Sequence, residues 1–232
     1  MADTVRVLST LALKGAMQSL ASQYQAAGGA RVDADFAPTL ALLDRLRAGQ
    51  AADVVMLTRE GLDEVAREGR VVVETCVDLA RSFVGIAVKA GAAHPDIATE
   101  GALCAALLAA RSVAYSRLGA SGILFAKLIE QLGIAAEINA RAQIIPQGFT
   151  AEKLVTGEVD LAVQQISELK QVVGIEVVGP IPRELQTPAI FSAGRMAAAN
   201  MPAEADRLLR FLASPAVAPA LRESGLEPGP NP

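Results

Sequence analysis

The residues best suited to chemistry lie in residues 112–134, which predict a short strand, a tight loop and an amphipathic helix. The loop, SRLGASG, places one cation, Arg117, and two hydroxyls, Ser116 and Ser121, at the start of that helix. A helix N-terminus offers unpaired N–H groups and the positive end of the helix dipole. A guanidinium adds charge-assisted hydrogen bonds. This combination predicts an anion-binding site.

Hydroxyl and amide side chains also lie at the other predicted strand-to-helix junctions. A Ser or Thr before a helix is often only a cap, but adjacent amides at the end of an apolar strand need partners. Carboxylates are scarce among these groups, so together they predict binding of an oxyanion or a small carboxylate. The further ligand-binding candidates are Ser9, Thr10, Thr39, Gln147, Gly148, Gln164 and Gln165, with Lys14 just inside the first helix.

Several other chemistries lack the residues they need. His94 is the only histidine and lies in a Gly/Ala/Pro loop, where a surface position is expected. Cys76 and Cys104 lack metal-ligand spacing and are interpreted as free thiols. No GxSxG elbow, Walker A loop or GxGxxG is present. The sequence therefore predicts neither a cofactor nor a metal.

Composition limits the partners. The chain has 232 residues, a net charge of −4 and a pI of about 5.2, so it carries no global basic field for nucleic acid. Aromatic residues make up only 3%, without tryptophan, so base-stacking platforms are absent. No apolar run approaches the ~20 residues of a membrane span. The opening MADTVRVLST resembles no signal peptide, which predicts a cytoplasmic protein, or a periplasmic one if a signal has been removed.

Two α/β series are predicted from periodicity. Apolar strands at 4–9, 31–36 and 53–57 alternate with helices, which indicates a parallel sheet covered on both faces. A strand at 81–88 starts the second series, and the EPGPNP end (227–232) is expected to be disordered. The further predicted helices are 10–27, 38–48, 60–68, 99–110, 151–156, 166–170, 203–213 and 216–223, and the further strands are 142–145, 159–164, 175–178 and 189–192.

The order of these elements predicts two lobes. Residues 1–83 with 188–232 form lobe 1, because the helical tail has too few strands for a domain of its own, and residues 84–187 form lobe 2. The chain then crosses between the lobes twice. Strand ends and helix starts of such lobes point into a shared cleft, so a ligand cleft between the lobes is expected.

Long stretches of the chain resemble the periplasmic molybdate-binding protein-like family of type II periplasmic binding proteins. They are VLSTLALKGAMQSLASQYQ, FAPTLALLDRLRAGQAADVVMLT, YSRLGASGILFAKLIEQLGI and GEVDLAVQQISEL with GIEVVGPIPRELQ. The last two are similar to a subgroup that includes aconitate isomerase. The resemblance implies a two-lobed type II periplasmic-binding-protein fold, a small-anion ligand and, if the chain is exported, an ABC-transporter permease as partner.

Carried over to this sequence, the family's ligand contacts fall near Ala12, Thr39, Ser121, Gln147–Gly148 and Gln165. True molybdate binders have a serine where Ala12 stands and a tyrosine near Gln165, and their sites are uncharged. Arg117 is an added cation, and a guanidinium suits a carboxylate through two parallel hydrogen bonds. The departures favour a di- or tricarboxylate over molybdate.

Three functions follow from the resemblance. The first is non-catalytic binding of a small carboxylate or oxyanion. The second is a cofactor-independent isomerase of an unsaturated tricarboxylate, which needs a base near the reacting carbon. The third and weakest is molybdate or tungstate binding. Lys14 is the first candidate for that base, Glu168 is a less favoured one and Tyr115 is remote.

Overall fold

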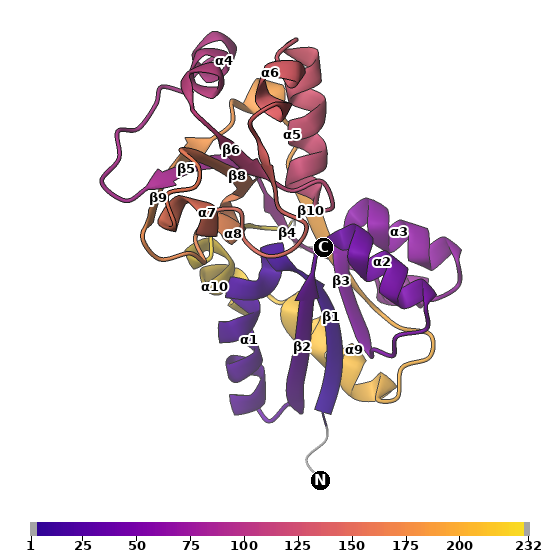
Figure 1. Cartoon of the computed structure of the whole chain (residues 1–232). Coiled ribbons are helices and arrows are strands. Elements are labelled where there is room, and N and C mark those ends of the chain that lie inside the picture. Colours follow the sequence, from indigo (N-terminus) through magenta and orange to yellow (C-terminus); the bar gives the residue numbers. More distant parts are fainter. Residues whose placement is uncertain (1–3, 230–232) are drawn as a thin grey trace. The chain divides into compact units, whose positions relative to one another are not determined.

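The computed structural model describes residues 4–229, which form an α/β protein of two compact units. Unit 1 comprises Met1–Ser82 and Ala189–Pro232, and unit 2 comprises Phe83–Pro188. Each unit contains one sheet with helices on both of its faces (Figure 1).

The sheet of unit 1 has the strand order β11-β4-β10-β3-β1-β2. Strands β1, β2 and β3 are parallel, so their carboxyl ends share one edge, where Thr10 lies opposite Ala37. The other three strands run antiparallel to their neighbours, so the expected wholly parallel sheet is in fact mixed. The strands are β1 (Thr4–Thr10), β2 (Arg31–Ala37), β3 (Val54–Thr58), β4 (Val77–Ser82), β10 (Ala189–Arg195) and β11 (Glu227–Pro228).

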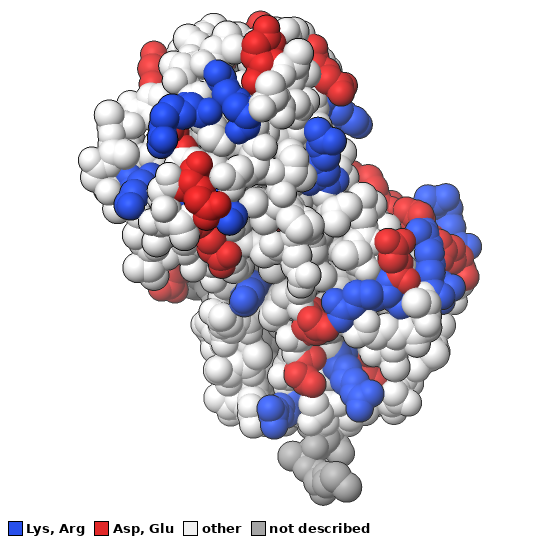
Figure 2. Space-filling model, in the orientation of Figure 1, with Lys and Arg blue, Asp and Glu red and all other residues white. Residues whose placement is uncertain are grey.

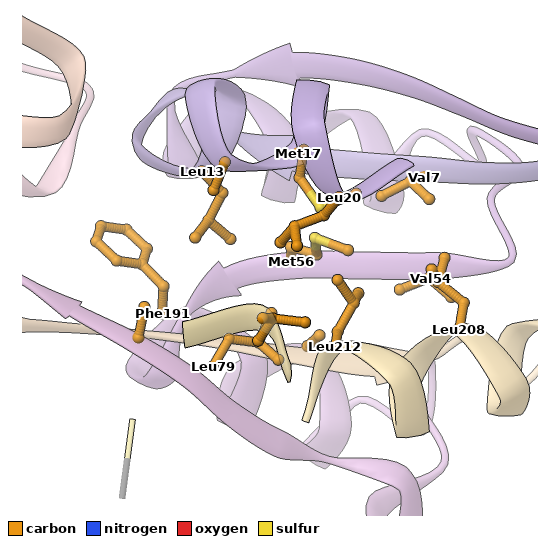
Figure 3. Close-up of a cluster of buried hydrophobic side chains, with 14 of the residues drawn as sticks. Val7, Leu13, Met17, Leu20, Val54, Met56, Leu79, Phe191, Leu208 and Leu212 are labelled. Atoms are coloured by element: carbon orange, nitrogen blue, oxygen red, sulfur yellow. The ribbon is translucent and has the colours of Figure 1, made fainter. Parts of the chain in front are cut away.

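Strand alternation divides the core of unit 1 into two layers. Val54 and Met56 face the layer under α1, α9 and α10, which Figure 3 shows in close-up. Val55 and Leu57 face the layer under α2 and α3. The helices are α1 (Lys14–Ala26), α2 (Thr39–Arg47), α3 (Arg59–Arg67), α9 (Pro202–Leu212) and α10 (Ala218–Glu223), with 3-10 turns η1 (Leu11–Leu13), η2 (Val73–Thr75) and η4 (Pro215–Val217).

The sheet of unit 2 has the order β7-β6-β8-β5-β9. Strand β6 is parallel to both β7 and β8, whereas β5 is antiparallel to β8 and β9. The carboxyl ends of β7, β6 and β8 therefore share an edge. The strands are β5 (Val84–Lys89), β6 (Val113–Tyr115), β7 (Gln143–Ile144), β8 (Leu161–Gln165) and β9 (Ile175–Pro180).

Helices cover both faces of this second sheet as well. One core layer packs under α4, α5 and α6, with Tyr115 against Phe125 at 5.1 Å between ring centroids. The other layer packs under α7 and α8, where Ala87, Ala114 and Leu154 meet. The helices are α4 (Glu100–Ala109), α5 (Ala120–Gln131), α6 (Ala135–Asn139), α7 (Glu152–Val155) and α8 (Ile166–Leu169), with the 3-10 turn η3 (Arg183–Leu185).

Three details differ from the sequence-based expectation. The strand predicted at 81–88 is two strands, β4 and β5, because the chain passes from one sheet to the other at Phe83. The short helix α6 was not predicted. Residues 227–228, expected to be disordered, pair with β4 as β11, and residues 230–232 of the same predicted segment lie outside the described residues.

The surface of unit 1 mixes charges of both signs. Figure 2 shows acidic and basic side chains side by side over α2 and α3. Arg47 pairs with Glu64 and Glu68, and Arg59 pairs with Asp63 at 3.1 Å. The ion pairs of Arg47 join α2 to α3 and its C-terminal end, whereas the Arg59 pair lies within α3. All of these pairs are exposed, so they add little to stability.

Candidate anion-binding site

Unit 1 places buried hydroxyls at the carboxyl edge of its parallel strands. Ser9 and Thr10 end β1, Thr39 follows β2, and Thr58 ends β3. The Ser9 hydroxyl donates to the Thr10 carbonyl at 3.2 Å. The Thr10 hydroxyl is buried without a hydrogen-bond partner among the described residues. A buried hydroxyl without a partner is costly, so Thr10 is set apart from the other hydroxyls of this edge by its unused hydrogen-bonding capacity.

Side-chain caps are present at some helix starts and absent at others. Thr58 caps α3 by accepting from the Gly61 N–H at 3.3 Å, and Thr99 caps α4 by accepting from the Ala102 N–H at 3.2 Å. The cap residues of η1, α2 and α5 are Thr10, Pro38 and Gly119, and none of them makes a side-chain cap. The first N–H groups of α2 and α5 thus keep their capacity for an anion.

Thr39 and Lys14 both begin helices of unit 1. Thr39 is the first residue of α2, and the cap position before it is occupied by Pro38, which has no hydroxyl. Thr39 is buried. Lys14 is the first residue of α1 and is partly exposed. Because η1 separates it from β1, it stands one short turn beyond the Thr10 edge.

Unit 2 begins α5 directly after β6 through a close backbone contact. A Cβ atom at Gly122 would lie 1.3 Å from the Ser116 carbonyl oxygen, so only glycine fits there. The Ser116 hydroxyl accepts from the Leu118 N–H at 3.2 Å, which shapes the loop. Ser121 is buried in the first turn of α5. The sequence SRLGASG thus holds an uncapped helix start against the end of β6.

Arg117 is the cation of this loop. Its Nη2 atom lies 3.3 Å from both the Tyr115 hydroxyl and the Asn139 side-chain oxygen, and its guanidinium carbon lies 5.9 Å from the Tyr115 ring centroid. The Tyr115 hydroxyl in turn donates to Asn139 at 2.5 Å. All these partners are neutral, and no carboxylate pairs with Arg117 in the described part of the chain. Its positive charge is therefore available to an anion.

Gln164 holds the loop that follows β7. Its side-chain oxygen accepts from the Thr150 N–H at 2.8 Å, and its Nε2 atom donates to the Gly148 carbonyl at 3.2 Å. Gly148 has a φ of +88°, which favours glycine. With its oxygen and nitrogen engaged, Gln164 is expected to position the loop of Gln147 and Gly148, while the Gln165 side chain faces the Glu168 backbone N–H in the capping box of α8.

Glu168 is a buried carboxyl beside Gln165. Its Oε2 atom accepts from the Gln165 backbone N–H at 3.2 Å, and the Gln164 side chain also hydrogen-bonds to it. Burial raises the pKa of Glu168 from 4.5 to about 8, against the lowering effect of both hydrogen bonds. The adjacent Ser167 hydroxyl is buried without a partner. Glu168 is thus largely protonated at neutral pH and can exchange a proton.

Thr58 ends a strand of the same edge and was not selected from the sequence, and its hydroxyl is engaged as the cap of α3. Glu168 was considered only as the less favoured base, and its burial was not predicted. The signal that could have promoted it is the QISE sequence after an apolar strand, which is a variant of the capping-box pattern and predicts a glutamate folded back on the strand end.

Two further properties concern the described residues as a whole. No three His, Cys, Asp or Glu side chains in residues 4–229 gather closely enough to hold a metal ion. In the same range, no helix has both the length and the apolar character needed to cross a membrane.

Known proteins identify the class. The family described as bacterial extracellular solute-binding protein matches residues 5–227, so the chain belongs to this family. An aconitate isomerase from Pseudomonas sp is 35% identical over 233 residues, which cover 98% of this chain and 88% of the relative.

Solved structures show the type II periplasmic-binding-protein fold. The periplasmic molybdate-binding protein of Azotobacter vinelandii has a TM-score of 0.81 at 15% identity. This match covers 96% of this chain and 98% of the molybdate-binding protein. The sulfate-binding protein of Mycobacterium tuberculosis has a TM-score of 0.73 at 14% identity. This match covers 98% of this chain and 87% of the sulfate-binding protein. The predicted fold and family are confirmed. The individual site residues, the lobe boundaries, the permease partner and the cellular location stay predictions.

Proposed function

We propose that this protein binds a small organic di- or tricarboxylate of the aconitate type. The observation that carries the proposal is the uncapped start of α5 together with the unneutralised charge of Arg117 just before it. Backbone N–H groups suit any oxyanion. The guanidinium adds a preference for a planar carboxylate.

The relatives support the same choice of ligand. The solved structures named above are called molybdate-binding and sulfate-binding, so the fold serves small anions. The relative with 35% identity is named for aconitate, an unsaturated tricarboxylate. A net charge of −4 does not oppose this ligand, because the helix-start N–H groups and the Arg117 guanidinium act on an anion at short range.

A thermal-shift screen tests the proposal. The ligands are trans-aconitate, cis-aconitate, citrate, malonate, sulfate and molybdate. A true ligand at ~100 times its Kd adds about 2.7 kcal/mol to the free energy of unfolding, which raises the Tm of a chain of this size by roughly 5 to 10 °C. We expect a tricarboxylate to give the largest shift. A shift with molybdate or sulfate alone would overturn the proposal.

Arg117→Gln is the variant that tests the role of the cation. It should reduce the affinity for the tricarboxylate about 10- to 100-fold, since a hydrogen bond to a charged group is worth about 1.5–3 kcal/mol. Arg111→Gln is the matched control in the same unit, because Arg111 is exposed and already pairs with Asp160 at 2.5 Å. Equal affinity in wild type and Arg117→Gln would remove Arg117 from the site.

We propose isomerisation of aconitate as a second candidate function, which the 35% identical relative and the buried Glu168 favour. A base takes a proton from the methylene carbon, the double bond shifts, and the same proton equivalent returns to the former vinyl carbon. The substrate and product are isomers, so no cofactor is consumed. Ultraviolet absorbance of a cis-aconitate solution follows the conversion. Binding without any conversion would leave the solute-binding role alone.

A further inference from the structure

Two carboxylates are buried in the described residues, Asp53 and Glu168, and their surroundings differ. Asp53 accepts hydrogen bonds from the backbone N–H groups of Arg6 at 2.8 Å, Asn200 at 2.7 Å and Met201 at 3.0 Å. Three backbone donors satisfy this buried carboxyl group and give Asp53 a structural role.

Glu168 has a much poorer set of donors. One backbone N–H, that of Gln165, and one side-chain amide, that of Gln164, are the hydrogen-bond partners acting on its carboxyl. A buried glutamate with so little compensation is expensive, and a leucine or glutamine would fill the same volume at lower cost. Groups of this kind concentrate where a proton has to be handled.

The position of Glu168 is the second observation. Its carboxyl folds back on the end of β8, at the edge of the sheet where the parallel strands β6 and β7 also end. Through Gln164 it is also connected to the Gly148 loop. The neighbouring Ser167 hydroxyl, 1% exposed and without a partner, is a further polar group near this end.

We propose that Glu168 is the acid–base residue of the aconitate isomerisation, an inference that rests on the second candidate function. Ionised Glu168 accepts a proton from the methylene carbon of aconitate, and the C–H electron pair forms the new double bond while the old one opens toward the vinyl carbon. The protonated Glu168 then delivers its proton to that vinyl carbon. Glu168 is ionised again at the end, and the substrate has gained and lost one proton.

The charged groups around α8 are engaged elsewhere. Helix α8 packs against β5, β8 and β9. Lys89 of β5 donates to the Val155 carbonyl at 3.2 Å, and Glu176 of β9 pairs with His94 at 2.8 Å. Lys170 follows α8 and is exposed. Burial raises the pKa of Glu168 and two hydrogen bonds lower it, and none of these charges contributes to the change. Proton transfer is therefore expected to follow the titration of Glu168 itself.

Glu168→Gln tests this assignment. Glutamine keeps the shape and the capping interaction but cannot carry a proton. We expect the turnover of the variant to fall at least 100-fold, while trans-aconitate still raises its Tm. The matched control is Glu130→Gln, an exposed glutamate of α5, which should keep full turnover. Lys14→Ala tests the base favoured by the sequence and should retain turnover within about tenfold.

The pH profile supplies a second readout. The kcat of the wild type should rise between pH 6 and pH 9 with an apparent pKa near 8, and the residual rate of Glu168→Gln should lack that rise. Full turnover by Glu168→Gln, or loss of turnover in Lys14→Ala alone, would overturn the assignment while the isomerase function stands. Absence of turnover in the wild type would instead refute the isomerase function and this inference with it, leaving carboxylate binding intact.

Discussion

Thr10 and Thr58 end neighbouring parallel strands, yet their hydroxyls have different roles. The Thr58 hydroxyl caps α3, whereas that of Thr10 has no partner. We therefore expect Thr10→Val to leave the Tm unchanged or slightly higher and to weaken trans-aconitate binding about tenfold or more. Thr58→Val should cost about 1 kcal/mol of stability with unchanged affinity. Calorimetric melting and titration measure both, and wild-type affinity in Thr10→Val would contradict the assignment.

The raised pKa of Glu168 predicts a pH dependence of stability as well as of turnover. Because its pKa is about 8 when folded and near 4.5 when unfolded, the folded state alone keeps the proton between these values. The free energy of unfolding should therefore fall as pH rises from 5 to 8, by at most about 5 kcal/mol. Glu168→Gln should lose this decline. Urea denaturation at pH 5, 7 and 9 checks it, and equal slopes in wild type and variant would count against a raised pKa.

The close contact between Gly122 and Ser116 at the start of α5 predicts how substitutions there affect stability. Gly122→Ala would place a Cβ atom on the Ser116 carbonyl, so the helix start must shift. We expect a loss of about 1–3 kcal/mol in stability and a weaker response to trans-aconitate. Gly119→Ala is the control three residues earlier, because its Cβ meets nothing within 4 Å and its φ of −102° suits alanine. Similar melting of the two variants would show that the close contact does not matter.

Element order was the most predictable property of this chain. The apolar runs that form β1, β3 and β8 are bounded by helix-start and glycine signals, and all three were predicted within two residues at either end. The errors arise where tertiary pairing decides. The run across Phe83 looks like one strand locally and is split because its halves join different sheets. The two-residue strand β11 exists only through its pairing with β4.

The candidate site was predictable only in part at the scale of the whole chain. Hydroxyls and amides after apolar strands are visible in the sequence, and so is the unusual cation Arg117. The unpartnered state of Thr10, the engagement of Gln164 and the burial of Glu168 are not, because burial and hydrogen-bond partners depend on residues far away in the sequence. The ranking of Lys14 above Glu168 reflected local position alone.

Candidate ligand groups lie in both units, Thr10 in unit 1 and Arg117 in unit 2. The affinities of Thr10→Val and Arg117→Gln for trans-aconitate show which of these groups bind it. Titration calorimetry of the two variants and the wild type measures the stoichiometry and the affinities. Loss of affinity in only one of the variants would assign the site to a single unit.

The most direct test of the central claim is isothermal titration of the wild-type protein with trans-aconitate and with molybdate. Carboxylate recognition through Arg117 and the helix start of α5 predicts saturable binding of trans-aconitate, at least tenfold tighter than that of molybdate. Saturable binding of molybdate with no heat from trans-aconitate, citrate or malonate would contradict it.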